Sequence, residues 1–397
     1  DYDCGHTGYP FMNESPNKTD LYNLDAELTA AQREVAARTR AFVDAEVLPC
    51  IAEYHDREEA PRHLKDGLAR LGILDLIAGE SPDPIAYGVA MRELERGSST
   101  LRSIMSVQGG LVVHPVKMFG SEEQKNRWLG PLTKLEAIGC FALTEPHFGS
   151  NPSAMETVAV ATAGEYRLHG HKRWATNATI ADVAVVWAKL EGRVTGFLVE
   201  LNQPGIEVRP IKGKVSFRTS ESAEILFHDV KLDASAILPG ARSLGAAMAC
   251  LNQARYSIAW GVIGAAQASL DETIAYLTAR PQFDGKPLAS HQLVQYKLAW
   301  MTAELTAMQL IARRLGELKS ADQLEPVHVS LAKMNNCRKA IEIVRTCREL
   351  LGANGIMTTR HIMRRMVDLE TVITYEGTEH IHALIVGGEL TGIKAFS

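Results

Sequence analysis

The chain has 397 residues, of which 46% are hydrophobic and 22% charged. This composition excludes disordered, collagen-like and small disulfide-stapled proteins. Lys plus Arg number 42 and Asp plus Glu number 47, a net charge of −5 that excludes the basic excess of nucleic-acid-binding proteins. No run approaches the roughly 18 apolar residues of a membrane span, and the first residues are polar. We therefore expect no membrane span, no secretion and a cytoplasmic location, with the six separately placed cysteines reduced.

Helical periodicity dominates the first third of the chain. Residues 1–20 show no period and predict a loose arm. Thr29 and Gln32 form a capping-box pattern, which predicts the start of a helix that ends before Pro49. Further helical patterns follow, so residues 21–138 predict an N-terminal helical domain.

The period changes in the middle of the chain and then changes back. Segments at 182–189, 196–201 and 223–232 are rich in β-branched and aromatic residues, and residues 139–240 predict a small β-barrel or β-sandwich domain. From there to residue 397, apolar residues recur at spacings of three and four over long segments. This pattern indicates a C-terminal bundle of four nearly antiparallel helices, and the fold class is α+β.

The common nucleotide and metal signatures are missing. Neither a Walker-type loop nor a strand followed by G-x-G-x-x-G occurs, which argues against a nicotinamide enzyme. The H-x-H pairs His169 with His171 and His380 with His382 lack a nearby third ligand. We interpret them as scattered polar histidines and predict no metal.

Three stretches carry a recognisable pattern: FALTEPHFGS at 141–150, RWATN at 173–177 and YEGTEHI at 375–381. In order and spacing they resemble the acyl-CoA dehydrogenase family and, within it, the glutaryl-CoA dehydrogenases. The resemblance implies an α, β, α fold that binds flavin adenine dinucleotide (FAD) between the β domain and the C-terminal helices. It also implies oxidation of an acyl-CoA thioester to its α,β-enoyl form.

The resemblance assigns Thr144 and Thr176 to hydrogen bonds with the flavin ring, Trp174 to packing against it and Ser150 to the pyrophosphate. RPQF at 280–283 and GANG at 352–355 resemble stretches that reach the FAD of a neighbouring subunit, which implies a homo-oligomer, a tetramer in most relatives. The full set of implied cofactor residues is Phe141, Leu143, Thr144, Gly149, Ser150, Trp174, Thr176, Arg280, Gln282, Phe283, Gly352, Asn354, Gly355 and Thr378. On their own, Trp174 and the two threonines would fit a β core equally well.

Glu376 is the implied catalytic base. Removing a proton α to a thioester carbonyl requires a carboxylate whose pKa burial has raised. Tyr375 before it and Gly377 with Thr378 after it predict a loop that enters a helix. The alternative is a solvated carboxylate at a helix start.

One segment indicates the class of substrate. Glu95, Arg102 and Ser106 match the residues by which glutaryl-CoA dehydrogenases hold the distal carboxylate. A buried cation needs an anionic partner, and a structural pairing of Arg102 with Glu95 would meet the same need. The resemblance also places Asn252, Arg255 and Tyr375 at the substrate channel.

The sequence thus predicts oxidation and decarboxylation of glutaryl-CoA to crotonyl-CoA, with electrons passed to an electron-transferring flavoprotein. The chain departs from the family pattern after Gly72, where a loop is shorter, at Asn151 and after Phe283. A paralogue for another acyl-CoA or a carrier-protein thioester therefore stays open, as do an oxidase or flavin monooxygenase and a catalytically silent scaffold on the same fold.

Overall fold

The computed structural model describes residues 19–162 and 164–395. The predicted arm therefore lies outside the described residues, except for Thr19 and Asp20. Thr19 is only 1% exposed, and its hydroxyl donates to Asp271 Oδ1 at 3.3 Å. The chain is thus already packed against the folded molecule at residue 19.

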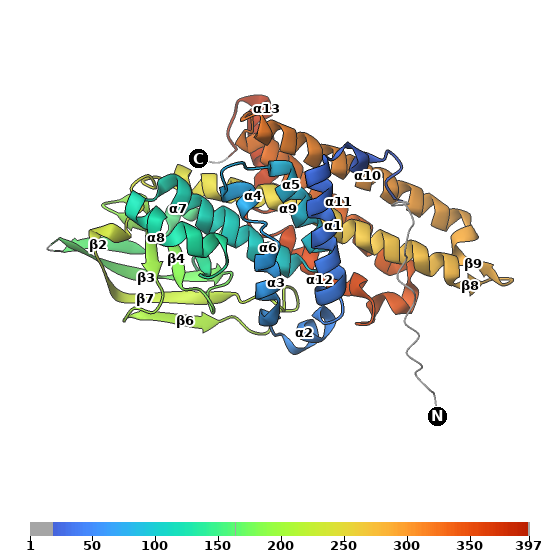
Figure 1. Ribbon diagram of the computed structural model, residues 1–397, viewed down its shortest axis with the longest axis horizontal. Helices are drawn as coiled ribbons and strands as arrows, with labels where there is room; N and C mark the ends of the chain where they lie inside the picture. Colours follow the sequence, from blue (N-terminus) through green and yellow to red (C-terminus); the bar gives the residue numbers. More distant parts are fainter. Residues whose placement is uncertain (1–18, 163, 396–397) are drawn as a thin grey trace.

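Helices form the first part of the described chain (Figure 1). The side chain of Thr29 accepts from Gln32 N while Gln32 caps Thr29 N, so the predicted capping box is confirmed. Two π-helical segments, η2 (Val43–Val47) and η4 (Val107–Val113), interrupt the series. The α-helices are α1 (Ala30–Phe42), α2 (Ile51–Arg57), α3 (Lys65–Arg70), α4 (Asp75–Ala78), α5 (Pro84–Gly97), α6 (Ser99–Ser106), α7 (His114–Phe119) and α8 (Glu122–Thr133).

A curled sheet of seven strands follows. Its strands are β1 (Gly139–Ala142), β2 (Val158–Thr162), β3 (Glu165–Ala175), β4 (Val183–Leu190), β5 (Arg193–Glu200), β6 (Ile206–Pro210) and β7 (Ala223–Leu232). The order is β1-β4-β2-β3-β7-β6, with β5 on the other edge of β4. β4 is parallel to β1 and β2, and the other pairs are antiparallel. Two apolar clusters cover the two faces of the sheet, one against helices and one enclosed by its own curl.

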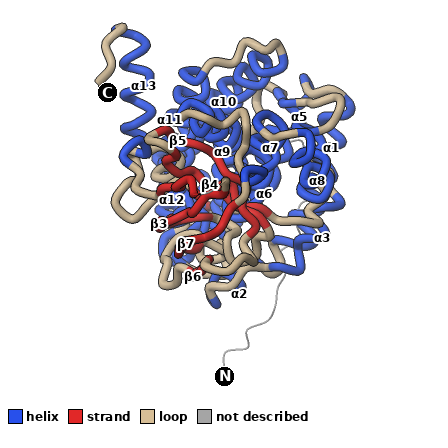
Figure 2. Tube along the Cα trace, turned by 90° about the vertical axis from the view of Figure 1, so that its left-hand side faces the viewer, coloured by secondary structure: helices blue, strands red, loops and turns tan. Residues whose placement is uncertain are grey.

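The C-terminal part contains α9 (Leu244–Ala279), α10 (Gln292–Ser320), α11 (Pro326–Leu350), α12 (His361–Val372) and α13 (Glu379–Thr391). The hairpin β8 (Pro281–Gln282) with β9 (Lys286–Pro287) joins α9 to α10, and the 3-10 segment η8 (Gly352–Ile356) follows α11. A single hydrophobic cluster includes residues of α1, α5 and α9 to α12, so both helical parts share one core. α13 packs against α11 and projects from one side of the molecule (Figure 2). None of the helices in the described chain is long and apolar enough to cross a membrane.

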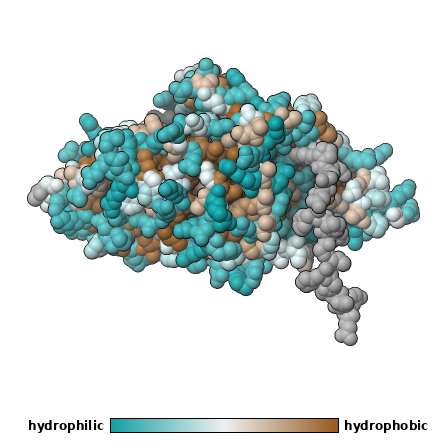
Figure 3. All heavy atoms as spheres, in the orientation of Figure 1, coloured by the Kyte–Doolittle hydropathy of each residue, from teal (hydrophilic) through white to brown (hydrophobic). Residues whose placement is uncertain are grey.

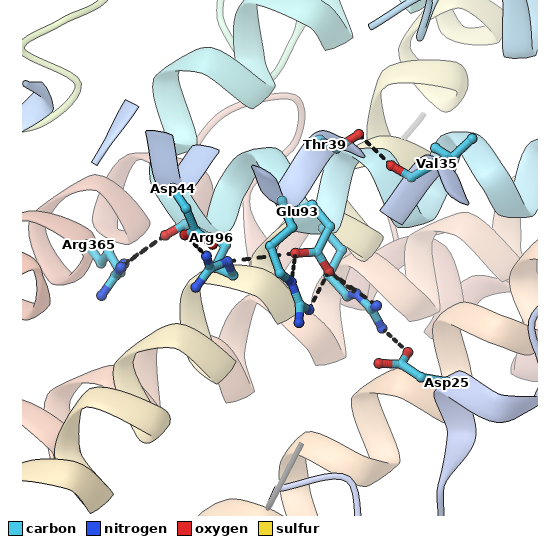
Figure 4. A network of polar contacts seen from close by, with 9 residues as sticks. Asp25, Val35, Thr39, Asp44, Glu93, Arg96 and Arg365 are labelled. Atoms are coloured by element: carbon cyan, nitrogen blue, oxygen red, sulfur yellow. Dashed lines mark hydrogen bonds and ion pairs between the residues drawn. The ribbon is translucent and has the colours of Figure 1, made fainter. Parts of the chain in front are cut away.

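A buried polar network fixes α5 within this core (Figure 4). The Glu93 carboxylate is 1% exposed and accepts from Arg40 of α1 at 2.8 Å and from Arg92 at 3.2 Å. Arg365 of α12 donates to the carbonyl of Arg96 at 2.9 Å. These contacts hold α5 between α1 and α12. The face of the molecule seen in Figure 3 is largely hydrophilic, in contrast to this interior. α5 and α6, which carry Glu95 and Arg102, are therefore positioned from several sides.

Candidate active site

The loop between α12 and α13 carries Tyr375 and Glu376. Glu376 has a φ of 52° and Gly377 a φ of 93°, so the chain turns sharply through the left-handed region. Thr378 then caps α13, its side chain accepting from Ile381 N at 3.3 Å. The predicted loop entering a helix is therefore confirmed.

Glu376 is half-buried. Its Oε2 is inaccessible to solvent and has no hydrogen-bond partner among the described residues. Its main-chain carbonyl accepts from Arg255 Nε at 2.8 Å. Burial raises the pKa of Glu376, and the cations Arg102, Lys333 and Arg255 partly oppose that rise. The solvated-carboxylate alternative does not fit this geometry.

Arg102 is fully buried beside this loop. Its Nε donates to Glu95 Oε2 at 2.6 Å, and its Nη2 donates to the Tyr375 hydroxyl at 2.5 Å. Gly261 of α9 makes room for the ion pair, because a Cβ there would lie 2.2 Å from Glu95 Oε2. The structural pairing considered from the sequence is thus present. It leaves Arg102 Nη1 and Glu95 Oε1 buried without partners in the described chain.

Smaller polar groups lie near this ion pair and the base loop. Ser106 and Ser257 are buried and hydrogen-bond through their hydroxyls at 2.6 Å. Arg255 Nη1 donates to Asn252 Oδ1 at 3.0 Å, which links two of the implied channel residues. The structure therefore connects Glu95 to Tyr375 through Arg102, and Asn252 to the base loop through Arg255.

The implied flavin-ring residues gather where the chain leaves β1 and β3, a place that we call the sheet edge. Thr144 accepts from Arg173 N at 2.8 Å through its carbonyl, next to Trp174. Trp174 is 52% exposed with a φ of 63°, where β3 and β7 lose register. Buried Lys172 holds the residues on both sides of Thr144, because its Nζ donates to Leu143 O at 3.0 Å and to Glu145 Oε1 at 2.8 Å. Phe141 and Leu143 lie in the apolar core under this edge, and Gly149 and Ser150 are exposed.

The remaining implied cofactor residues lie elsewhere. Arg280 and Phe283 are exposed, and the β8–β9 hairpin is at the opposite end of the molecule from the sheet (Figure 1). Asn354 of η8 joins that end, donating to the Tyr276 hydroxyl at 3.0 Å. Gly352 is exposed, whereas Gly355 packs where a Cβ would lie 2.3 Å from Arg348 O. Within one chain, Arg280, Gln282, Phe283, Gly352, Asn354 and Gly355 are thus not brought to Thr144 and Trp174.

Sequence reasoning missed residues that surround the base. Lys333 of α11 is 1% exposed and donates to Gly377 O at 2.8 Å. His382 is fully buried, and its Nε2 would lie 2.9 Å from a Cβ at Gly377, so interpreting it as a scattered polar histidine was wrong. Tyr87 is 2% exposed, and Gly109 leaves space beside its hydroxyl. The available signals were weak: a lysine and a tyrosine on otherwise apolar helix faces.

No group of three His, Cys, Asp or Glu side chains in residues 19–162 and 164–395 is arranged to hold a metal ion. The site is instead a half-buried carboxyl near a buried guanidinium, and the β domain presents the exposed indole of Trp174 with the half-buried Thr144 and Thr176. This arrangement suits deprotonation of a bound carbon acid beside a planar cofactor.

Comparisons with known proteins agree with this geometry. Family models for the N-terminal, middle and C-terminal domains of acyl-CoA dehydrogenase match residues 29–136, 140–230 and 244–391. The mitochondrial short-chain specific acyl-CoA dehydrogenase of Bos taurus is 32% identical over 92% of this chain and 91% of its own. A solved glutaryl-CoA dehydrogenase from Mycobacterium smegmatis in complex with FADH2 is 43% identical, with a TM-score of 0.94, over 96% of this chain and all of that one.

A further similar chain comes from a solved structure described as an electron transferring flavoprotein of Acidaminococcus fermentans. It is 26% identical, with a TM-score of 0.87, over 91% of this chain and 98% of that one. The three matched domains together span most of the sequence, in the same order as the helical, β and helical parts of the fold. The chain therefore belongs to the acyl-CoA dehydrogenase family.

Proposed function

We propose that this acyl-CoA dehydrogenase, whose family depends on FAD, oxidises and decarboxylates glutaryl-CoA. The observation that carries the proposal is Arg102, a buried cation beside the base loop with Nη1 left unpartnered in the described chain. The 43% identity to a glutaryl-CoA dehydrogenase supports it. The 32% identity to a short-chain specific enzyme supports the competing choice of a monocarboxylic acyl-CoA.

Arg102 recognises the distal carboxylate in this proposal. An unsatisfied buried donor costs about 1–3 kcal/mol, and more where the donor is charged, so a ligand that supplies an acceptor gains that free energy. A carboxylate suits a guanidinium because its oxygens accept charge-assisted hydrogen bonds. The Ser106 hydroxyl, one helical turn from Arg102 on α6, supplies a further hydrogen bond in this proposal. Glu95 keeps Arg102 in place and limits its excess charge.

Glu376 removes the α-proton. A carboxylate whose pKa is raised by burial is a stronger base than a solvated one, and exclusion of water prevents the proton from being lost to solvent. Oε2 is inaccessible to solvent and has no partner in the described chain, so we assign the proton to it. The backbone N–H of Glu376 is the donor that we assign to the thioester oxygen, where negative charge develops.

The sheet edge fits the flavin. Trp174 offers a half-exposed indole face held in a backbone conformation that non-glycine residues seldom adopt, which is typical of ligand sites. The half-buried hydroxyls of Thr144 and Thr176 make no hydrogen bond within the described residues and are available as donors. When bound there, FAD supplies the hydride acceptor for the substrate β-hydrogen.

Loss of the distal carboxylate completes the reaction. In the enoyl product the bond to that carboxylate is conjugated with the thioester, so the electrons left by departing CO₂ are delocalised. Protonation then gives crotonyl-CoA. We propose an electron-transferring flavoprotein as the acceptor of the electrons. The similarity to a chain from the Acidaminococcus fermentans structure, which is described as an electron transferring flavoprotein, supports this choice.

A homo-oligomer, a tetramer by family resemblance, explains the exposed residues at the far end of the molecule. Arg280, Gln282 and Phe283 lie away from the sheet edge of their own chain. In the proposal they and the η8 residues reach the FAD pyrophosphate of a partner subunit, for which the planar fork of arginine is suited.

An anaerobic titration tests the substrate and the base together. The purified protein is titrated with glutaryl-CoA, butyryl-CoA and longer acyl-CoAs while the flavin absorbance is followed. We expect glutaryl-CoA to bleach the flavin fastest, and Glu376→Gln to slow bleaching by about 10² to 10⁴-fold while substrate binding persists.

The other outcomes of this titration separate the alternatives. Faster bleaching by butyryl-CoA would contradict the glutaryl-CoA assignment and leave the family activity. Near-normal bleaching by Glu376→Gln would refute the base. Rapid reoxidation of the reduced protein by oxygen, coupled to turnover, would favour an oxidase or monooxygenase, and no bleaching by any thioester would favour a silent homologue.

A further inference from the structure

Lys333 is a buried lysine that the proposed chemistry does not use. It lies in the middle of α11, whose neighbours on the chain pack into the main apolar cluster, and only 1% of it is exposed. A lysine in such a place loses its hydration, so its amine must find acceptors inside the protein.

The acceptors that it finds are both at the loop that carries Glu376. Nζ donates to Gly377 O at 2.8 Å and to Val372 O at 3.4 Å. Val372 is the last residue of α12, and Gly377 directly follows Glu376. One amine therefore joins the two ends of the segment that contains Tyr375 and Glu376.

The segment between Val372 and Gly377 needs contacts from its surroundings to keep its conformation, because its backbone is strained. Glu376 is a non-glycine residue at positive φ, a conformation that costs about 1–3 kcal/mol and persists only where the surroundings enforce it. On the side of α9, Arg255 Nε holds the Glu376 carbonyl. On the side of α11, Lys333 is the group that holds the adjoining carbonyls.

The surroundings of the Lys333 amine are those of the site itself. Burial lowers the pKa of Lys333, while Cys337 and Glu376 oppose that change and the cations Arg255 and Arg102 add to it. The amine also lies 5.9 Å from the centre of the Tyr375 ring. Among the described residues, the only hydrogen-bond acceptors of this amine are Gly377 O and Val372 O, at the two ends of the base loop.

We propose that Lys333 is a positioning residue for the catalytic step: by tying Val372 O to Gly377 O it holds the Glu376 carboxylate in the geometry needed for proton abstraction. This inference rests on the proposed role of Glu376 as the base. It assigns to Lys333 no contact with the substrate, so its loss should impair proton removal and leave substrate binding intact.

The test compares Lys333→Met, which removes the donors, with Lys333→Gln, which keeps N–H donors on a shorter side chain. Lys339→Met is the matched control, because Lys339 lies on the same helix and pairs at the surface with Glu304 and Glu342. Each FAD-loaded variant is mixed anaerobically with substrate, using α-deuterated and unlabelled glutaryl-CoA or whichever acyl-CoA reduces the wild type. Hydrogen–deuterium exchange of the peptide spanning residues 372–380 gives a readout independent of activity.

We expect Lys333→Met to lower the limiting rate of flavin reduction by about 10²-fold, because a misplacement of about 1 Å costs that much. The substrate concentration for half-maximal rate should change less than threefold, the α-deuterium isotope effect should rise, and the loop should exchange faster. Lys333→Gln should fall between Met and wild type. Lys339→Met should match wild type in all four measurements.

A wild-type limiting rate and isotope effect in Lys333→Gln and Lys333→Met would overturn the proposal, even with a lower melting temperature. If Lys333→Met does not fold, a wild-type rate with unchanged loop exchange in Lys333→Gln is sufficient to refute it. Glu376→Gln is measured in parallel. A normal rate in that variant means that the base assignment has failed, whereas a slow Glu376→Gln beside a normal Lys333→Met means that only the positioning role has failed.

Discussion

Arg102 is a single buried cation to which we assign a role both in the fold and in substrate recognition. Glu95 and Tyr375 occupy Nε and Nη2, and Nη1 has no partner in the described chain. The two roles predict different consequences of removing it. Loss of one member of a buried ion pair costs about 3–5 kcal/mol in stability, because the partner charge stays buried. Loss of a substrate contact lowers kcat/KM only for the substrate that makes it.

Replacing Arg102 with Leu should therefore lower kcat/KM for glutaryl-CoA by roughly 30-fold to several thousand-fold, the equivalent of about 2 to 5 kcal/mol. Turnover of butyryl-CoA should be little affected. The double variant Glu95→Gln with Arg102→Gln removes both charges, so it should regain stability without regaining glutaryl-CoA activity. Equal losses for the two thioesters, measured by steady-state kinetics, would show that Arg102 acts only through the fold.

The sequence could reveal part of this arrangement. Glu95 and Arg102 lie seven residues apart on consecutive helices, so their pairing could be considered from the sequence alone. Tyr375 is 273 positions from Arg102 along the chain, and Lys333 is 44 from Gly377. Contacts of that kind depend on how helices pack, and no local pattern encodes them. The cofactor roles of the residues at 280–283 and 352–355 stay predictions.

At the scale of elements, α12 is the link between the β domain and the base loop. Asp368 of α12 accepts from Phe217 N at 2.8 Å, in the loop between β6 and β7. The ring of Phe217 lies 5.7 Å from that of Tyr375. Local signals such as the capping box at Thr29 were legible in the sequence. The docking of this loop was not, because it depends on the contact between Phe217 and Asp368, which lie 151 positions apart along the chain.

Asp368 gives this link a pH dependence. Burial raises its pKa from 3.8 to about 6, against the opposing effect of Arg364. Because the folded state holds the proton more tightly than the unfolded state, this group favours folding most below pH about 4. Its contribution falls as pH rises to about 6 and is constant above that. The total loss corresponds to about 2 to 3 kcal/mol.

Asp368→Asn resembles the protonated carboxyl and keeps an oxygen for Phe217 N. Its free energy of unfolding, measured with urea, should match wild type near pH 4 and exceed it at pH 7.5 by about 2 to 3 kcal/mol. Glu370→Gln is the control, since Glu370 lies on the same helix and is exposed beside Arg345. A difference between Asp368→Asn and wild type that does not change with pH would contradict this reasoning.

The whole molecule combines a continuous helical core with a sheet edge at which we propose that the cofactor binds. The shared core of α1, α5 and α9 to α12 holds Glu376 and Arg102 on helices and a short braced loop. The implied flavin-ring residues are on the sheet, and the implied pyrophosphate residues are split between that edge and the opposite end. The composition and periodicity predicted the α+β class and the helical, β, helical order, which the structure confirms.

Anaerobic single turnover of carboxyl-labelled glutaryl-CoA by the FAD-loaded protein, followed by mass analysis of the products, decides whether oxidation and decarboxylation both occur. The arrangement of Arg102 beside Glu376 predicts crotonyl-CoA and labelled CO₂ in amounts equal to the flavin reduced. Recovery of unreacted glutaryl-CoA with the flavin still oxidised, under conditions in which butyryl-CoA reduces it, would contradict the proposed function. Accumulation of glutaconyl-CoA without CO₂ would contradict the decarboxylation step.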